Sequence, residues 1–235
     1  MKFIHILGAA GLAASLPSDP VVGRNDTRAF NEIHNVHIQQ GIVRNDLVNG
    51  NPGSCPTAIF IFARGTSEFL NMGVVVGPLV AKTLENKIAN MADDATLWVQ
   101  GVGVPYTASI IDSVSPLRTS QDAIDKAIEL FNRANELCAD TPILAAGYNQ
   151  GTAVIARAIE DLDQSVIDQI AGVALFGYTL NRQNSGLIPG FPEERTQVYC
   201  RWFDLTCRGV LVPYSSLYLH EAHHEGPDFL AGQLP

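Results

Sequence analysis

The sequence predicts an α/β fold, a three-layer sandwich in which a central, mostly parallel sheet carries helices on both faces. Two observations predict it. Short apolar runs rich in strand-forming residues recur along the chain, and segments with apolar residues at helical spacing separate them. Strands that alternate with helices at such distances form parallel sheets, because each crossover helix returns the chain to the same end of the sheet. The 235 residues, 46% of them hydrophobic, are enough for one such domain.

The first half of the chain supplies two strands and two helices. Residues 57–63 are a continuous apolar run, typical of a central strand that is buried on both faces. Residues 73–90 have apolar positions close to helical spacing and are predicted as a crossover helix, and residues 95–100 are the next strand. Residues 120–137 are the clearest helix, because their apolar side chains form one stripe and Ser120 can cap the first turn.

The second half continues the alternation. Residues 143–146 are a short apolar strand and residues 152–162 the helix that follows it. Residues 170–177 and 196–200 are further strand candidates. The sequence has neither internal repeats nor a low-complexity tract, so we expect no second domain.

The N-terminal residues indicate export. Lys2 is followed by an apolar run and by small residues near Ala14, the pattern of a secretory signal, and the run is too short to span a membrane. We therefore predict a cleaved signal peptide over residues 1–17 and a secreted, extracellular protein. The polar residues 18–53 are expected to form a loosely attached arm with one short helix around residues 28–38, and residues 54–235 to form the domain itself.

Four cysteines fit an oxidising compartment and allow three pairings. Cys200 and Cys207 are close in sequence, so we expect them to form a small clip, which leaves Cys55 to pair with Cys138. The alternative is a set of free buried thiols, which is uncommon in an exported chain.

Charge limits the kinds of partner. The chain has 15 basic and 24 acidic residues, a formal net charge of −9, and no basic cluster offsets it. This balance argues against binding to nucleic acid or to anionic membranes, because both require positive charge on the protein. A neutral or apolar substrate fits better, and we expect a monomer that needs no cofactor.

One short stretch is typical of an active site. Apolar residues end at Gly147, Gly151 follows four positions later, and a helix is predicted directly afterwards. In the G-x-S-x-G elbow of α/β-hydrolases, two such glycines allow a strained central residue to present its side chain above the sheet. Here the central residue is Asn149, and a carboxamide has neither a suitable labile proton nor a competent attacking atom.

Several segments in the same order carry a resemblance to a known family. They cover most of residues 55–210 and are residues 62–66, 98–103, 147–151, 159–162, 175–179, 183–184 with 188–189, and 200–207. On these segments the chain resembles the cutinases, a family of secreted α/β-hydrolases. The four cysteines also fall where that family has its two disulfides.

The resemblance implies hydrolysis of carboxylic esters, including the polyester cutin, by a Ser-His-Asp triad. It implies an oxyanion hole formed by Thr66, through its backbone N–H and hydroxyl, and by the backbone N–H of Gln150. It also implies that Asp204 is the acid of the triad; the less favoured alternative is a turn or capping carboxylate.

The sequence departs from the family pattern at two triad positions. Asn149 stands at the position of the nucleophile, and an ungapped count from Asp204 puts Leu217 at the position of the histidine. His220 is the nearest imidazole and fits only if its loop is longer or shifted. We therefore expect an inactive or severely impaired cutinase, a pseudoenzyme that can bind cutin or another apolar ester without turnover. The alternatives are an active cutinase whose sequence carries a variant, and a non-catalytic lipid-binding or effector protein.

A competing motif lies near the C-terminus. His220 and His224 satisfy the H-E-x-x-H pattern of zinc proteases, with Glu221 as the base. The pattern requires a helix that puts both imidazoles on one face, whereas Gly226 and Pro227 follow at once. We therefore predict a polar surface loop and no metal site.

Overall fold

The structure is a computed structural model that describes residues 41–210 and 218–235. These residues belong to one unit, His37–Pro235. The predicted signal peptide, the predicted helix around residues 28–38 and the position of Leu217 lie outside the described residues.

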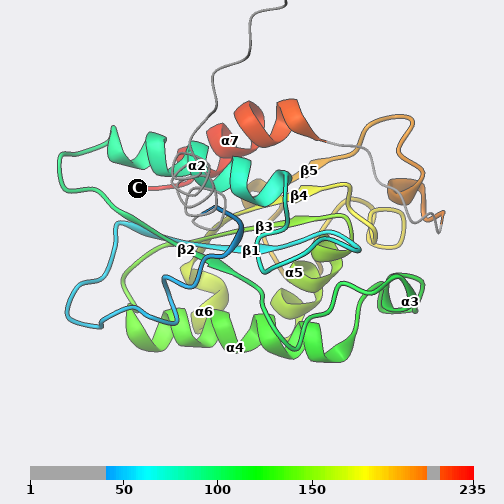
Figure 1. The fold of residues 1–235 in the computed structure, drawn as a ribbon, viewed down its shortest axis with the longest axis horizontal. Coiled ribbons are helices and arrows are strands. Elements are labelled where there is room, and N and C mark those ends of the chain that lie inside the picture. Colours follow the sequence, from blue (N-terminus) through cyan, green and yellow to red (C-terminus); the bar gives the residue numbers. More distant parts are fainter. Residues whose placement is uncertain (1–40, 211–217) are drawn as a thin grey trace, which may run out of the picture. The chain divides into compact units, whose positions relative to one another are not determined.

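A five-stranded sheet in the order β2-β1-β3-β4-β5 forms the centre, and every neighbouring pair is parallel (Figure 1). The strands are β1 (Ala58–Ala63), β2 (Leu97–Gly101), β3 (Ile143–Tyr148), β4 (Ile170–Phe176) and β5 (Thr196–Tyr199). The five predicted strands are confirmed. Because all strands run in the same direction, their carboxyl ends meet at one edge, where ligand sites of open α/β sheets are found.

Helices cover both faces of this sheet, as predicted. Figure 1 shows α2 (Val76–Ala89) and α7 (Gly226–Gly232) on one face, and α4 (Gln121–Leu137), α5 (Gln150–Glu160) and α6 (Gln164–Gln169) on the other. The short α3 (Ile110–Ser113) follows β2. Three brief turns complete the described elements: η1 (Glu193–Arg195), η2 (Thr206–Arg208) and the π-helical η3 (Glu221–Glu225).

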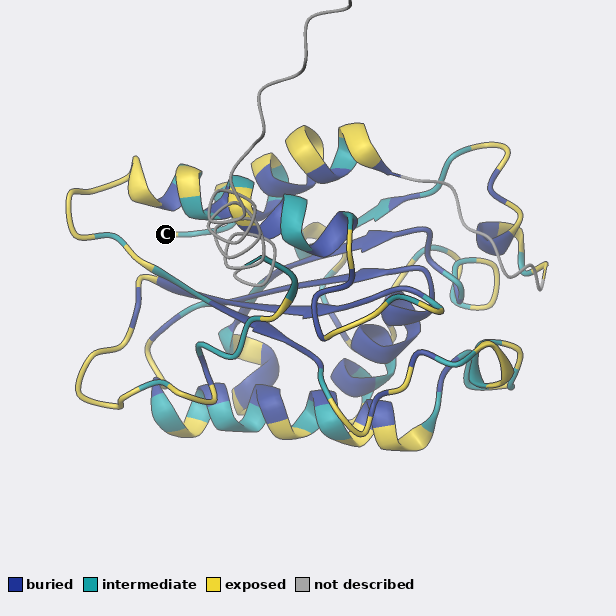
Figure 2. Ribbon diagram, viewed as in Figure 1, coloured by how far each residue is buried: buried dark blue, intermediate teal, exposed yellow. Residues whose placement is uncertain are grey.

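Alternate side chains of the strands fill two cores. In β1, Ile59 and Ile61 belong to the cluster on the side of α4 and α5, whereas Phe60 and Phe62 belong to the cluster on the side of α2 and α7. All six residues of β1 and all six of β3 are buried, as Figure 2 shows for the centre of the sheet. A strand buried on both faces needs apolar residues at every position, which explains the continuous apolar runs in the sequence.

The segment before β1 corrects one expectation. The backbone N–H of Asp46 donates to the carbonyl of Val99 at 3.1 Å, and that of Gly101 donates to the carbonyl of Arg44 at 3.0 Å. Leu47 is fully buried in the core. A loosely attached arm is therefore wrong for this stretch, because β2 is an edge strand whose free backbone groups gain hydrogen-bond partners from it.

Both predicted disulfides are present, Cys55–Cys138 and Cys200–Cys207, so the alternative of free thiols is wrong. Within the described parts of the chain, every helix is too short or too polar to cross a bilayer.

Candidate active site

The elbow lies where β3 meets α5. β3 ends at Tyr148 and α5 begins at Gln150, so Asn149 forms the whole turn, with φ 48° and ψ −117°. A Cβ atom on Gly151 would lie 2.0 Å from the carbonyl oxygen of Ala63, and one on Gly147 would lie 2.4 Å from the carbonyl oxygen of Gly151. Both positions therefore require glycine, and the predicted order of strand, turn and helix is present.

Hydrogen bonds hold the backbone of the apex in this conformation. The N–H of Asn149 donates to the carbonyl of Phe176, at the end of β4, at 2.9 Å. The carbonyl of Asn149 accepts from the N–H of Thr152 at 2.9 Å and also from the Thr152 hydroxyl. A non-glycine residue at positive φ is uncommon and persists when its surroundings fix it in this way.

The side chain of Asn149 contacts both groups that the sequence nominated for an oxyanion hole. Its Oδ1 atom accepts from the backbone N–H of Gln150 at 2.7 Å and from the Thr66 hydroxyl at 2.7 Å. A backbone N–H can only donate, so the atom facing it is the carbonyl oxygen and not the amide nitrogen. Asn149 is only 5% exposed. The structure therefore brings Thr66, Asn149 and Gln150 together around one carboxamide oxygen.

Thr66 is positioned by the loop that leaves β1. The carboxylate of Glu68 accepts from the backbone N–H of Gly65 at 2.7 Å and from that of Val74 at 3.0 Å. Arg64 is buried and donates to the backbone carbonyls of Glu68 at 2.9 Å and Tyr106 at 2.8 Å.

Burial lowers the pKa of Arg64 from its ordinary value, but an arginine remains charged. The sequence analysis did not single out Arg64 or Glu68, and their roles in positioning Thr66 follow from these contacts.

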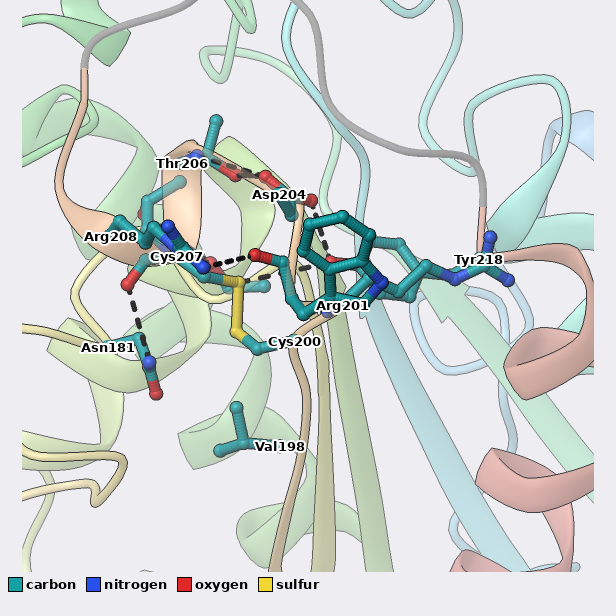
Figure 3. The surroundings of a disulfide bond; sticks show 12 residues. Asn181, Val198, Cys200, Arg201, Asp204, Thr206, Cys207, Arg208 and Tyr218 are labelled. Carbon is teal, nitrogen blue, oxygen red and sulfur yellow. Dashed lines mark hydrogen bonds between the residues drawn. A yellow bond between two sulfur atoms is a disulfide. The ribbon is translucent and has the colours of Figure 1, made fainter.

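Asp204 lies beside the second disulfide and is 2% exposed. One carboxylate oxygen accepts from the N–H of Thr206 at 2.9 Å and from its hydroxyl, and the other accepts from the hydroxyl of Tyr218 at 2.6 Å (Figure 3). Burial, and next the Asp204 carboxylate, raise the pKa of Tyr218 far above its ordinary value. The phenol therefore stays protonated and donates a hydrogen bond to Asp204. The sequence analysis did not nominate Tyr218. The one feature that could have drawn attention to it is that it follows Leu217, the expected position of the triad histidine.

A small cavity joins the loop of Asp204 to the elbow. Asn149 and Thr206 both line it, with Arg118, Thr179 and Val210 among the other lining residues, and its volume is about 20 Å³. A space of this size holds about one water molecule.

His220 is placed elsewhere. Its side chain is 67% exposed, and its Nε2 atom lies 3.5 Å from a carboxylate oxygen of Glu225. Among the described residues, the partners of Asp204 are Thr206 and Tyr218, and His220 is not one of them. The structure therefore does not bring His220 to the carboxylate that it was expected to meet.

The H-E-x-x-H segment also differs from its expected form. Residues 221–225 form the π-helical η3, which runs directly into α7, so the predicted surface loop is wrong. Pro227 lies in the first turn of α7, directly after the π-helical η3, so it does not end the helical segment here. His220, His223 and His224 are exposed, as predicted for this segment.

Exposed apolar side chains follow the carboxyl ends of β1, β2 and β5, the edge that carries the elbow. We call this set the apolar rim: Phe69, Val104, Ile111, Val114, Trp202, Phe203 and Val210. Val104 is 85% exposed, Ile111 81% and Trp202 80%. Val114 and Val210 line the cavity beside Asn149, so the rim reaches the elbow.

Comparison with known proteins agrees with this architecture. The family model described as Cutinase matches residues 54–234. A cutinase of Didymella rabiei is 50% identical over 195 residues, covering 82% of this chain and 85% of the relative. Cutinase 2 of Fusarium vanettenii is 41% identical over 234 residues, covering 98% and 95%.

Solved structures agree as well. A Trichoderma reesei cutinase in complex with a phosphonate inhibitor superposes with a TM-score of 0.68 at 26% identity, covering 92% of this chain and 94% of that one. An acetylxylan esterase shares the fold, with a TM-score of 0.58 at 18% identity over 77% of this chain and 100% of its own. On the family match, the relatives and the α/β-hydrolase architecture together, the chain belongs to the cutinase family.

Proposed function

We propose that this protein is a secreted, monomeric member of the cutinase family that binds an apolar carboxylic ester, such as cutin, without covalent turnover. The observation that carries the proposal is Asn149 at the apex of the elbow, with φ 48° and a buried side chain. Ester cleavage through an acyl-enzyme needs an attacking oxygen or sulfur atom with a base beside it. A carboxamide at that point provides neither.

The surroundings of Asp204 support the same conclusion. Its carboxylate accepts a hydrogen bond from Tyr218, whereas His220 is exposed and lies beside Glu225. A triad needs an imidazole between the carboxylate and the nucleophile, because the imidazole takes the proton of the nucleophile. Residues 211–217 contain no histidine in the sequence, so this segment cannot supply one.

The apolar rim supports an apolar ligand. Large exposed apolar side chains that gather at one edge of a sheet mark ligand or interaction surfaces. The rim borders the elbow, so an acyl chain lying on it would place its ester group near Asn149. Export is supported by the predicted signal over residues 1–17 and by the two disulfides, which persist in oxidising compartments.

Hydrolysis of p-nitrophenyl butyrate tests the proposal. We expect no hydrolysis above the buffer background from the wild-type protein or from Asp204→Ala, because the elbow carries no attacking oxygen or sulfur atom. Asn149→Ser alone should restore little activity, since a serine without an adjacent imidazole stays protonated. Asn149→Ser combined with Leu217→His should exceed either single variant, by at least about 100-fold if the relay forms.

The alternative is an active esterase, which the names of the relatives favour. Wild-type turnover that disappears in Asp204→Ala would establish this alternative and reject our proposal. Full activity in Asn149→Ser alone would show that only the nucleophile is missing.

A further inference from the structure

We propose that Asn149 closes the oxyanion hole of its own protein, so that ligands bind through their acyl chain while the ester carbonyl is kept out. This inference rests on the proposed function, because it defines how a non-hydrolytic member of the family would hold an ester. It concerns which part of the ligand is recognised and not whether the ligand is cleaved.

The hydrogen-bond capacity of the site carries the first step. The backbone N–H of Gln150 and the hydroxyl of Thr66 each have one proton to donate. Both protons point to Oδ1 of Asn149, at 2.7 Å and 2.7 Å. These are the distances that an oxyanion hole offers to a substrate oxygen. The carboxamide oxygen therefore occupies the position that the carbonyl oxygen of an ester would need.

The second step is that the carboxamide cannot easily move aside. The backbone of Asn149 is fixed by hydrogen bonds to Phe176 and Thr152, so the Cβ atom keeps its position. Rotation of the side chain would also leave the N–H of Gln150, which is fully buried, without its acceptor.

The consequence is a specific ligand preference. In the wild-type protein, Oδ1 of Asn149 takes two of the three expected donors and occupies the position of the ester oxygen. The carbonyl of an ester therefore adds little affinity, and an ester and an alcohol with the same chain should bind about equally well. Removal of the carboxamide should open the hole and create a preference for the ester.

The experiment measures binding of methyl hexanoate and of 1-hexanol by NMR titration of the folded, full-length protein. Asn149→Gly removes the side chain and suits positive φ, and Asn149→Ala keeps the Cβ atom as a second test. We expect both variants to bind the ester about tenfold more tightly than the wild-type protein does, with the alcohol unchanged, since the ester gains hydrogen bonds. Circular dichroism and thermal unfolding check that each variant is folded.

Thr66→Val tests whether the hole is the cause. In the wild-type background this change should leave ester binding unchanged, because the hydroxyl already bonds to Asn149. In the Asn149→Gly background it should remove most of the gain.

Two results would overturn the inference: no gain in ester affinity in folded Asn149→Gly, or weaker ester binding by Thr66→Val in the wild-type background. Neither result depends on hydrolysis. Conversely, turnover by the wild-type protein would reject the proposed function and leave these binding data to be judged separately.

Discussion

At the scale of single residues, the contact between Thr66 and Asn149 predicts a measurable coupling in stability. The Thr66 hydroxyl donates to a carboxamide oxygen that is buried, so its loss leaves that oxygen with one donor fewer. Thr66→Val should lower the free energy of unfolding by about 1 kcal/mol in urea. In an Asn149→Ala background the same change should cost less, with a coupling of about 0.5 to 1.5 kcal/mol.

Thr107→Val is the matched control, since Thr107 is exposed and its hydroxyl lies 3.5 Å from its acceptor on Asp112. We expect a change within about 0.5 kcal/mol there. Additive effects of the two substitutions at Thr66 and Asn149 would mean that the hydrogen bond contributes nothing to folding.

The sequence predicted some residues of this site and not others for a physical reason. Asn149 could be found because flanking glycines and a strand-to-helix change define an elbow locally. Thr66 and Asp204 were nominated by the resemblance. Thr66 is half-buried and bonds to Asn149, and Asp204 is buried and bonds to Thr206, which lines the cavity beside the elbow. Tyr218 could not be found, because its contact with Asp204 joins residues 14 positions apart through packing that leaves no periodic pattern. For the same reason, spacing alone could not show that His220 points to Glu225.

At the scale of elements, the close approach of α5 to β1 predicts that one added methyl group is strongly destabilising. A Cβ atom on Gly151 would lie 2.0 Å from the backbone oxygen of Ala63, and backbone cannot move aside without disturbing the sheet. Gly151→Ala should destabilise the protein by about 3 kcal/mol or more, measured by urea unfolding.

Gly232→Ala is the control, because Gly232 lies at the end of α7 and a Cβ atom there would meet nothing within 4 Å. It should be neutral or slightly stabilising, since alanine favours helix more than glycine does. Equal effects of the two changes would contradict the close approach of α5 to β1.

A second prediction at this scale concerns the ion pair that joins the end of β5 to η3. Arg201 donates to both carboxylate oxygens of Glu221, at 2.8 Å and 2.7 Å. Hydrogen bonding from Arg201 is the main cause that lowers the pKa of Glu221 from its ordinary value of 4.5. A depressed pKa means that the pair stabilises the folded state above pH 4.5, and that this stabilisation is lost as the pH falls through the folded pKa.

Glu221→Gln should therefore unfold more easily than the wild-type protein at pH 7, by about 1 kcal/mol or less, and the difference should vanish in strong acid. Thermal unfolding across the acidic range measures it. Glu129→Gln is a matched control, because Glu129 is 61% exposed and pairs with Lys126 on the surface of α4. A difference for Glu221→Gln that stays constant with pH would show that the ion pair is not its origin.

The elements also show where local patterns stop being informative. Continuous apolar runs predicted the three central strands β1, β3 and β4, because a central parallel strand needs apolar residues on both faces. The polar residues 44–48 gave no such pattern, yet their backbone bonds to the edge strand β2, since unpaired strand edges attract whatever chain is near. Gly226 and Pro227 were interpreted as a helix end, although proline is tolerated in a first helical turn.

At the scale of the whole molecule, the two disulfides have different roles: one crosslinks the scaffold, and the other lies at the candidate site. Cys55 lies just before β1 and Cys138 caps α4, so their bond closes a loop of 83 positions that contains β1, α2, β2, α3 and α4. The Cys200–Cys207 bond spans only 7 positions and encloses Asp204 (Figure 3). The entropy that a crosslink removes from the unfolded chain grows with loop length.

Replacing Cys55 and Cys138 by alanine should therefore cost about 4 to 5 kcal/mol in urea unfolding, and replacing Cys200 and Cys207 about 2 to 3 kcal/mol. The effect on the surroundings of Asp204 should have the opposite order, with the larger change on loss of the short disulfide. Loss of the short disulfide frees the loop that holds Thr206 against that carboxylate, whereas loss of the long one leaves it in place. NMR chemical shifts of Thr206 and Tyr218 report this second effect. If the short disulfide proved the more important for stability, the loop around Asp204 would be part of the folding scaffold and could not be remodelled without loss of the fold.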